Sequence, residues 1–543
     1  MKRSVVAFLG KDNMEIEDLQ STSSDFKSFY HPNFDDKTMV LCISKNQGKA
    51  DWSTLFSDYS VEQKEFSQHS VKAALFVKIG LRYVIFTFGH GRGLINKSSI
   101  ERGFGLKVSM NLGDPGQLKS VDKSTLERVA RNTRSQVSIN SGIEDFDFEF
   151  DHEILKSMTA IVVRDDDELE MISGKDSVSL YTDIDFDKFE EIASRLIDAY
   201  ESNLYKEKYP WAEFIKIEVD PSITSELEEL LVRSINNRDL DNFWLAPPSI
   251  INYEDFSGFV YSTKNPPCKH PELDLYSFLS EAPFKQRNNI SIAALKKKVI
   301  KIYNGDDKKI DEFPVFDALN GEAEYKGNKY VLNDGLWYQI SNTFAEEVEK
   351  FFIELPIWKG LENKPYQDKR ECCYLRRIAD GEEIAVLDQH WVRHKEVKQN
   401  YEFCDLLTQC GRIIHVKHYG GSSVLSHLFS QATNGVEMLL NCPEIIPQIQ
   451  EYLEETYLSF DFDPKKERKN RVVLAIIQEK QGDLHIPFLS KVNLRHHARG
   501  MMNRGFTVEL AKIPVDSILA AKALDEQKCI CKSKTAIATR DVG

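Results

Sequence analysis

The chain has 543 residues, several times the usual domain size of about 100–200 residues, so the sequence predicts more than one domain. A hydrophobic share of 41%, with only 27 Gly and 18 Pro, excludes collagen-like, mucin-like and wholly disordered proteins. The 85 acidic residues outnumber the 70 basic ones and give a net charge of −15. This charge opposes indiscriminate coating of nucleic acid, so any site for a polyanion must be local.

The sequence also predicts a cytoplasmic protein that neither spans nor binds a membrane. Its most apolar early stretch, residues 73–89, is interrupted by Lys78 and Arg82, and no run reaches the roughly 20 apolar residues of a membrane span. The apolar N-terminus stops at Lys11, which favours a first β-strand over a signal peptide. Nine cysteines, an odd number without zinc-type spacing, favour reduced thiols.

We expect a multidomain α+β protein whose first part, residues 1–235, is an N-terminal α+β region. Two β-rich runs around Gly80, within residues 71–88, have the pattern of a hairpin. A strand-like run at 178–182 precedes residues 183–200, whose apolar side chains recur at helical spacing.

Residues 236–360 are expected to form a small middle domain with β hairpins. Its predicted strands lie around 313–325, 330–332 and 336–340. An amphipathic helix at 344–353 leads into proline-punctuated sequence, which places a domain boundary near residue 360. At the other end of the chain, the polar residues 516–543 are predicted to be a flexible tail.

The third predicted domain, residues 361–515, has the clearest order of elements. A helix is followed by three strands, the last two of which form a hairpin, and then by two helices, a strand, a basic helix and a strand. The predicted elements are 366–379, 383–388, 401–408, 413–419, 424–440, 444–458, 472–477, 491–504 and 506–513. This order predicts a mixed sheet flanked by helices.

That order, with Asp405 on the second strand and Lys417 on the third, resembles the restriction-endonuclease-like, or PD-(D/E)xK, nuclease core. The resemblance covers roughly residues 366–513. It implies that a helix carboxylate and a strand aspartate bind Mg²⁺ or Mn²⁺, while a lysine helps to activate the attacking water. The matching positions are Glu371 and Asp405 as metal ligands and Lys417 as the assisting cation.

One position departs from the family pattern. The acid expected two residues before the lysine is replaced by His415, which strand alternation places on the same face as Lys417. His415 could bind a metal or act as a base, or the fold could be degenerate and non-catalytic. Glu402 is a possible substitute carboxylate, although alternation along one strand would send it to the face opposite Asp405. The competing interpretation is a solvated strand face with no chemistry.

Local charge supports a nucleic-acid site in the same region. Residues 465–512 contain eleven basic and four acidic residues, against the overall negative charge of the chain. The alternative is a surface patch that faces the acidic helix of the same chain. The candidate nucleic-acid-binding residues are Lys465, Lys466, Arg468, Lys469, Arg471, Lys491, Arg495, Arg499 and Arg504.

Stretches spread over nearly the whole chain resemble a sporadically distributed family of uncharacterised bacterial proteins of about 500–550 residues, a domain of unknown function. The stretches are 83–92, 100–106, 111–115, 414–429 and 487–493. Patchy distribution is typical of defence or restriction-type genes, so the resemblance implies antiviral or mobile-element biology and a possible defence-system partner. It implies no verified catalytic residue.

Three functional hypotheses follow from the sequence. The first is a metal-dependent nucleic-acid-cleaving protein of a bacterial defence system. The second is a non-catalytic module that binds nucleic acid or a partner through a degenerate nuclease fold. The third is a nucleotide-handling enzyme built around Gly89–Gly93, which follows a strand but lacks the Lys-Ser/Thr ending of a P-loop. The sequence does not decide whether the nucleic acid is DNA or RNA, what triggers activity, or which oligomer the protein forms.

Overall fold

The structure is a computed structural model of the chain. It describes residues 2–22, 25–31, 38–49, 67–127, 131–163, 169–254, 256–261, 268–281, 289–368, 370–380, 382–393, 400–419, 422–442, 444–454 and 470–516. The chain divides into two compact units. The first contains residues 1–125 and 131–217, and the second contains residues 126–130 and 218–543.

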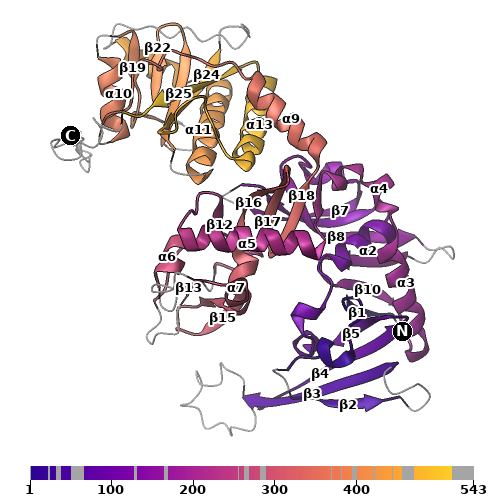
Figure 1. Ribbon diagram of the computed structural model, residues 1–543. Coiled ribbons are helices and arrows are strands. Elements are labelled where there is room, and N and C mark those ends of the chain that lie inside the picture. Colours follow the sequence, from indigo (N-terminus) through magenta and orange to yellow (C-terminus); the bar gives the residue numbers. More distant parts are fainter. Residues whose placement is uncertain are drawn as a thin grey trace, which may run out of the picture. The chain divides into compact units, whose positions relative to one another are not determined.

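The first unit is built on one long antiparallel sheet, drawn from indigo to purple in Figure 1. Its strands lie in the order β2-β3-β4-β5-β1-β10-β9-β8-β6-β7. They are β1 (Lys2–Leu9), β2 (Lys27–Tyr30), β3 (Met39–Lys49), β4 (Ser67–Ile79), β5 (Arg82–Phe88), β6 (Leu118–Thr125), β7 (Asn132–Ser141), β8 (Glu153–Val163), β9 (Leu169–Gly174) and β10 (Val178–Asp183). The other elements of this unit are α1 (Ile16–Leu19), α2 (Phe104–Leu112), α3 (Phe189–Glu201), α4 (Tyr205–Lys208) and β11 (Ile215–Ile217).

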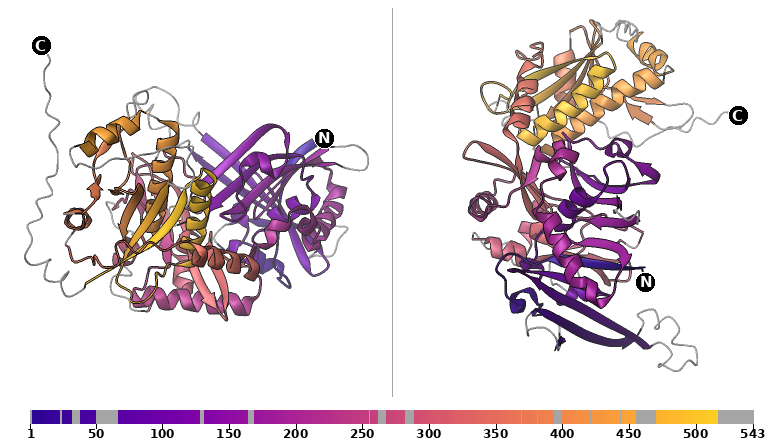
Figure 2. Two further views of the ribbon diagram at one scale, coloured as in Figure 1. Left: turned by 90° about the horizontal axis from the view of Figure 1, so that it is seen from above. Right: turned by 90° about the vertical axis from the view of Figure 1, so that its right-hand side faces the viewer.

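Alternation along the strands gives this sheet two apolar faces. On β1, Val5 and Ala7 join the core under α2 and α3, while Phe8 joins a smaller core on the opposite face. The predicted hairpin is confirmed, because β4 and β5 pair antiparallel across Gly80, whose φ of 59° suits glycine. The long strands β3 and β4 are drawn in indigo at the foot of the right-hand view of Figure 2. The strand and helix expected at 178–200 are also confirmed, as β10 and α3.

Helix α2 crosses β9 so closely that only glycines fit at the crossing. A Cβ atom added at Gly174 would lie 1.9 Å from the Gly105 carbonyl oxygen. We therefore expect Gly174→Ala to lower the free energy of unfolding by about 2 kcal/mol, as overpacking does. Gly93→Ala is the control, since its added Cβ meets nothing within 4 Å. Urea unfolding of both variants measures this free energy. If Gly174→Ala were as stable as wild type, α2 and β9 would not pack as closely as described.

The Gly89–Gly93 stretch also has a packing explanation. Residues 91–94 form a 3-10 turn against β4, where a Cβ atom at Gly91 would lie 2.0 Å from the Ala73 carbonyl oxygen. The Arg92 guanidinium lies over the Phe8 ring, 5.9 Å from its centroid. These contacts account for Gly91 and Arg92 without a bound phosphate.

The second unit begins with a core built from residues 227–337. Its long helix α5 (Pro221–Asn237) packs Leu227, Leu231 and Ile235 into this core, so the first unit ends at residue 217 rather than at the expected 235. Strands β18-β17-β16-β12 form one sheet and β13-β14-β15 another. The elements are β12 (Phe243–Leu245), β13 (Gly258–Val260), α6 (Leu275–Ser280), α7 (Ile292–Lys297), β14 (Val299–Tyr303), β15 (Lys309–Pro314), α8 (Val315–Ala318), β16 (Leu319–Tyr325), β17 (Asn328–Asn333), β18 (Leu336–Ile340) and α9 (Asn342–Glu354).

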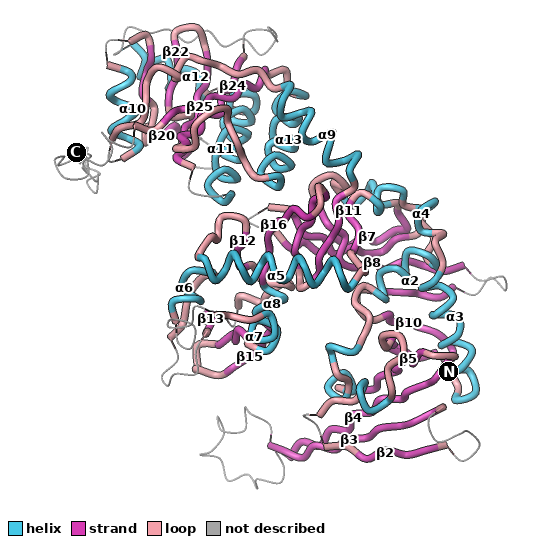
Figure 3. The backbone as a smooth tube through the Cα atoms, viewed as in Figure 1, coloured by secondary structure: helices cyan, strands magenta, loops and turns pink. Residues whose placement is uncertain are grey.

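The C-terminal part of this unit has its own mixed sheet, β19-β22-β23-β24-β25. The first three strands are antiparallel, and β23, β24 and β25 are parallel. Figure 3 shows helices around this sheet. Their bounds, with the strands, are α10 (Glu371–Ala379), β19 (Ile384–Val386), β20 (Trp391–Arg393), β21 (Asn400–Glu402), β22 (Leu406–Thr408), β23 (Arg412–His418), α11 (Ser422–Asn441), α12 (Ile445–Glu454), β24 (Arg471–Gln478), α13 (Phe488–Asn503) and β25 (Thr507–Pro514).

Both faces of the C-terminal sheet are covered, which explains the unbroken apolar run of β24. Helix α10 packs on the face that carries Ile414 and Val416. Helices α11, α12 and α13 pack on the face that carries Ile413 and Leu474. The predicted mixed sheet flanked by helices is therefore present, and the chain as a whole is α+β.

One predicted strand is wrong in a way that matters for the site. Residues 401–408 do not form a continuous strand, because β21 pairs with β20 and β22 pairs with β19 and β23. Residues 403–405 between them belong to no strand. Alternation therefore cannot be counted from Glu402 to Asp405. Of the predicted tail at 516–543, all but Asp516 lies outside the described residues.

Two expectations about compartment can be compared with the structure. Among the described residues, no helix is both long enough and apolar enough to cross a membrane. Cys373 is disulfide-bonded, whereas the other cysteines of the described part of the chain have free thiols. The expectation of reduced thiols is therefore wrong at Cys373.

Candidate metal centre

Three carboxylates meet at one edge of the C-terminal sheet. Asp388 follows β19, Glu402 ends β21 and Asp405 precedes β22. One carboxylate oxygen from each lies within 4.8 Å of the other two. Asp405 is buried, with 4% of its surface exposed, and the other two are half-buried. The group is therefore a compact set of oxygen ligands that opens outward from a buried aspartate.

The backbone around Asp405 holds this group together. The Asp405 carbonyl oxygen accepts hydrogen bonds from the amides of Leu387 (2.9 Å) and Asp388 (3.1 Å). Its carboxylate oxygen Oδ2 accepts a 2.6 Å hydrogen bond from the Val416 amide on β23. These contacts tie the segment that follows β19, and strand β23, to the residue that precedes β22.

Glu402 is oriented by a turn with unusual backbone geometry. Gln389 has a φ of 61°, in the left-handed region that non-glycine residues rarely adopt. Its amide donates a 2.7 Å hydrogen bond to Glu402 Oε1. Such conformations persist where the surrounding structure imposes them, often at functional sites.

Lys417 and Glu371 add a cation and a fourth carboxylate. Lys417 Nζ lies 2.9 Å from Glu371 Oε1. Glu371 Oε2 accepts a 3.1 Å hydrogen bond from the His418 amide. Glu371 is the first residue of α10, where the helix N-terminus favours a negative side chain. The helix and β23 thus join at the same sheet edge as the three carboxylates.

The pKa shifts show that these groups act on one another. Burial raises the pKa of Asp405 to about 7, against the hydrogen bond from Val416 and the charge of Lys417. Burial, followed by the charges of Glu402 and Glu371, raises the pKa of Asp388. Burial lowers the pKa of Lys417, but Glu371, Asp405 and Glu402 outweigh it and raise the pKa overall. Carboxylates crowded in this way gain from a bound cation.

His415 does not join the carboxylates. Its ring is buried near α11, where a Cβ atom at Gly435 would lie 3.5 Å from His415 Nε2. Nε2 is buried without a hydrogen-bond partner among the described residues. Burial, followed by the charge of Lys417, lowers the pKa of His415 to about 3. The imidazole is therefore neutral and faces the apolar core beneath α11.

Asp388 is a site residue that the family pattern did not indicate, and Glu402 lies beside Asp405 instead of on the opposite face. A signal for Asp388 existed, since an acid directly after a strand often lies at the sheet edge. Glu402 could not be placed, because its relation to Asp405 depends on the break between β21 and β22. On β23, His415 occupies the position where the family pattern expects its second acid. Asp388 and Glu402 lie beside Asp405 instead.

The donor set suits a hard divalent cation. All three clustered ligands are carboxylate oxygens, which Mg²⁺ and Mn²⁺ prefer over imidazole or thiolate. Asp388, Glu402 and Asp405 would hold such an ion. Bound there, a divalent cation supplies Lewis-acid polarisation of a phosphoryl oxygen and a more acidic water.

The candidate nucleic-acid-binding residues are dispersed by the structure. Lys465, Lys466, Arg468 and Lys469 lie outside the described residues. Arg471 pairs with Glu509 (3.4 Å) and Arg504 pairs with Glu437 (2.9 Å). Arg499 is exposed, with its guanidinium over the Phe351 ring.

Helix α13 uses its other basic residues within the chain. Lys491 pairs with Glu349 (2.6 Å) and Arg495 with Glu347 (3.1 Å), both on α9, and both bases are buried. The amides of Phe488 and Leu489 at the helix N-terminus donate to the Glu322 carboxylate. Lys491 and Arg495 therefore hold α13 in place rather than facing solvent.

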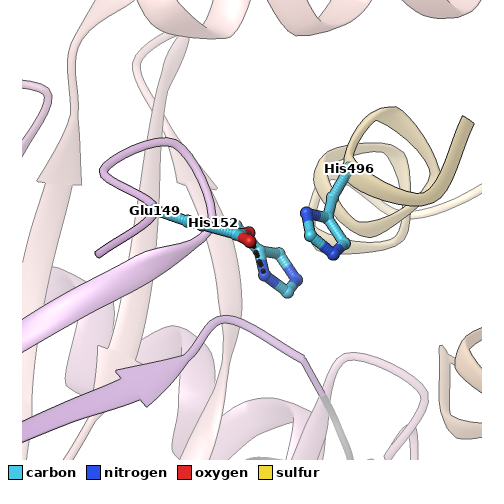
Figure 4. A group of neighbouring side chains, drawn as sticks. All are labelled: Glu149, His152 and His496. Atoms are coloured by element: carbon cyan, nitrogen blue, oxygen red, sulfur yellow. Dashed lines mark ion pairs between the residues drawn. The ribbon is translucent and has the colours of Figure 1, made fainter. Parts of the chain in front are cut away.

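The first unit contains a smaller acid–histidine pair. His152 Nδ1 lies 3.7 Å from Glu149 Oε2, and Figure 4 shows this ion pair. Figure 4 also draws His496, which belongs to the second unit. Because the pair offers only two ligand atoms, we assign it no metal.

Comparisons with known proteins place the chain by family. A family model described as a family of unknown function, DUF6119, matches residues 7–514. No curated protein and no solved structure matches the chain. The expected membership in a family of unknown function is thus confirmed over nearly the whole chain.

Proposed function

Since the chain belongs to the DUF6119 family, whose function is unknown, we propose its function from the residues at the candidate metal centre. Asp388, Glu402 and Asp405 are called the carboxylate cluster below. We propose that it is a divalent-metal-dependent nuclease of a bacterial defence or restriction-type system. The observation that carries the proposal is Lys417 beside Glu371 and three converging carboxylates. The substrate is a phosphodiester of DNA or RNA.

Each residue of the cluster has a role in this proposal. Asp388, Glu402 and Asp405 hold Mg²⁺ or Mn²⁺ through their oxygens. Lys417 positions the attacking water and stabilises the negative charge that develops on the phosphate. Glu371 keeps Lys417 charged and aimed at the cluster through their 2.9 Å ion pair. His415 takes no part in the chemistry, because it faces the core beneath α11.

The order of elements supports the same function. Along the chain, helix α10 precedes the antiparallel strands β19, β22 and β23, and helix α11 precedes the parallel strand β24, with β20, β21 and α12 inserted between them. This is the order that the restriction-endonuclease-like resemblance implies. The acid that this resemblance expects on β23 is supplied, in our proposal, by Asp388 and Glu402 from neighbouring strand ends.

One observation favours a second function, a non-catalytic module that binds nucleic acid or a partner protein. Both oxygens of Glu371 already have partners within the chain, the Lys417 ammonium and the His418 amide. A site that satisfies its own charges can keep a nuclease-like fold without cleaving. Salt-sensitive nucleic-acid binding without cleavage, in the presence of metal, would identify this function.

Cleavage tests the proposal. Purified full-length chain is incubated with plasmid DNA, single-stranded DNA and RNA, with Mg²⁺, Mn²⁺ or EDTA, beside Asp405→Ala/Lys417→Ala. We expect metal-dependent cleavage of one substrate class and a loss of at least about 100-fold in the double variant. The matched control is Asp380→Ala/Lys359→Ala, which removes the same charges at exposed positions. Equal cleavage by all three proteins would overturn the proposal.

A further inference from the structure

A second group of metal-binding side chains lies in the middle part of the second unit. It consists of Cys268, His270 and Glu281, near β13 and α6 in Figure 1. One ligand atom from each residue lies within 4.8 Å of the other two. The donors are a thiol sulfur, an imidazole nitrogen and a carboxylate oxygen, so this group prefers a different metal from the all-oxygen carboxylate cluster.

Backbone pairing brings Cys268 and His270 to one side. His270 forms an isolated antiparallel bridge with Phe259 of β13, with a 2.8 Å hydrogen bond in each direction. Because side chains alternate in extended chain, Cys268 and His270 share a face and Lys269 takes the other. Lys269 Nζ accordingly binds Ser257 Oγ (2.9 Å) and the Asn304 carbonyl (3.1 Å).

The His270 ring is fixed in orientation. It stacks on the Tyr261 ring, with centroids 4.5 Å apart and planes 23° apart. The Tyr261 hydroxyl donates to the Glu272 carbonyl (3.1 Å) and accepts from the Asp274 amide (3.0 Å). These bonds hold Tyr261 at the start of α6, so the imidazole is positioned by its neighbours before any ligand binds.

Glu281 approaches from the end of α6, as its C-cap residue. Its Oε1 contacts His270 Nε2. Its Oε2 is buried and has no hydrogen-bond partner among the described residues. A buried carboxylate oxygen without a donor is costly, and a cation at this point would satisfy it.

We propose that Cys268, His270 and Glu281 bind one Zn²⁺ ion. Zinc accepts thiolate, imidazole and carboxylate ligands together, whereas Mg²⁺ does not bind thiolate or imidazole in this way. Three protein ligands leave one tetrahedral position for water. The ion ties the bridge beside β13 to the C-terminal end of α6, so it stabilises the middle domain independently of the carboxylate cluster.

The first measurement is metal content of full-length chain purified without a metal-affinity step. We expect close to one zinc per chain in wild type and at least a tenfold loss in Cys268→Ser. Cys410→Ser is the matched control, because Cys410 is also exposed but lies in the C-terminal sheet region. Asp405→Asn, a change in the carboxylate cluster, should retain the zinc. Wild type without zinc after dialysis against ZnCl₂, or zinc retained in Cys268→Ser, would overturn the proposal.

Cobalt substitution identifies the thiolate directly. Co²⁺ bound to a cysteine sulfur gives a thiolate-to-metal charge-transfer band in the near ultraviolet, which oxygen ligands do not give. We expect the band in wild type and Cys410→Ser and its loss in Cys268→Ser. Cys268→His should lose the band but keep zinc, which separates a lost ligand from a misfolded domain. A band that persists in Cys268→Ser would contradict the site.

Discussion

Replacing Asp405 by Asn is expected to stabilise the metal-free protein while it abolishes cleavage. Burial raises the pKa of Asp405 to about 7, so at about pH 8 the folded chain carries a costly buried charge. Because the folded pKa lies above the unfolded one, this group's contribution to stability falls as pH rises from about 4 to about 7. Asn removes the charge and keeps an oxygen for the Val416 amide.

The expected gain in free energy of unfolding is up to about 4 kcal/mol near pH 8 and about 2 kcal/mol near pH 5. Urea unfolding in EDTA measures it, as the difference between variant and wild type at each pH. The same variant should lose at least about 100-fold in metal-dependent cleavage. Asp380→Asn, at an exposed position, should change neither quantity. A variant that is both less stable and inactive would make Asp405 a structural residue.

His415→Leu is expected to remove a stability loss at acid pH. Burial and the charge of Lys417 lower the pKa of His415 to about 3. Because the folded pKa lies below the unfolded value of about 6.5, the histidine's contribution is present near pH 7 and is lost as pH falls toward 3. As the pH is lowered from about 8 to about 5, the free energy of unfolding of His415→Leu minus that of wild type should therefore rise by about 2 kcal/mol.

The measurement is again urea unfolding at the two pH values, with His427→Asn as the control at an exposed position of α11. Leucine also removes the unpartnered Nε2 atom, so we expect the variant to be at least as stable as wild type near pH 8. If our assignment of His415 to the core is right, cleavage survives in His415→Leu. Loss of cleavage in a folded variant would contradict this assignment and indicate that His415 takes part in catalysis.

The order of the C-terminal elements could be predicted because each has a strong local signal. The apolar run of β24 has the length of a strand buried on both faces, and the apolar face of α11 recurs at helical spacing. The hairpin of β22 and β23 is marked by Gly411, whose φ of 82° suits its turn. These signals depend on residues close together in sequence.

The composition of the carboxylate cluster could not be predicted in the same way. Residues 401–408 read as one strand, and nothing local shows that Glu402 pairs with Trp391 while Leu406 pairs with Val386. Asp388 reaches the cluster through hydrogen bonds to the Asp405 carbonyl. Which acids share the site is therefore decided by strand pairing and not by alternation along one strand.

Charge counting failed on α13 for a related reason. The excess of basic residues in 465–512 includes Lys491 and Arg495, whose partners Glu349 and Glu347 lie 142 and 148 residues away in sequence. A local window cannot contain such partners. Net charge of a segment therefore says little about exposed charge until the fold is known.

Manganese binding tests the central claim most directly. Mn²⁺ is titrated into full-length wild type and Asp388→Asn/Glu402→Gln, and free ion is followed by electron paramagnetic resonance. The control is Asp380→Asn/Glu382→Gln, which removes two acids from exposed positions. We predict a saturable Mn²⁺ site in wild type and control, weakened at least tenfold in Asp388→Asn/Glu402→Gln. Equal binding by all three proteins would contradict a metal centre formed by Asp388, Glu402 and Asp405.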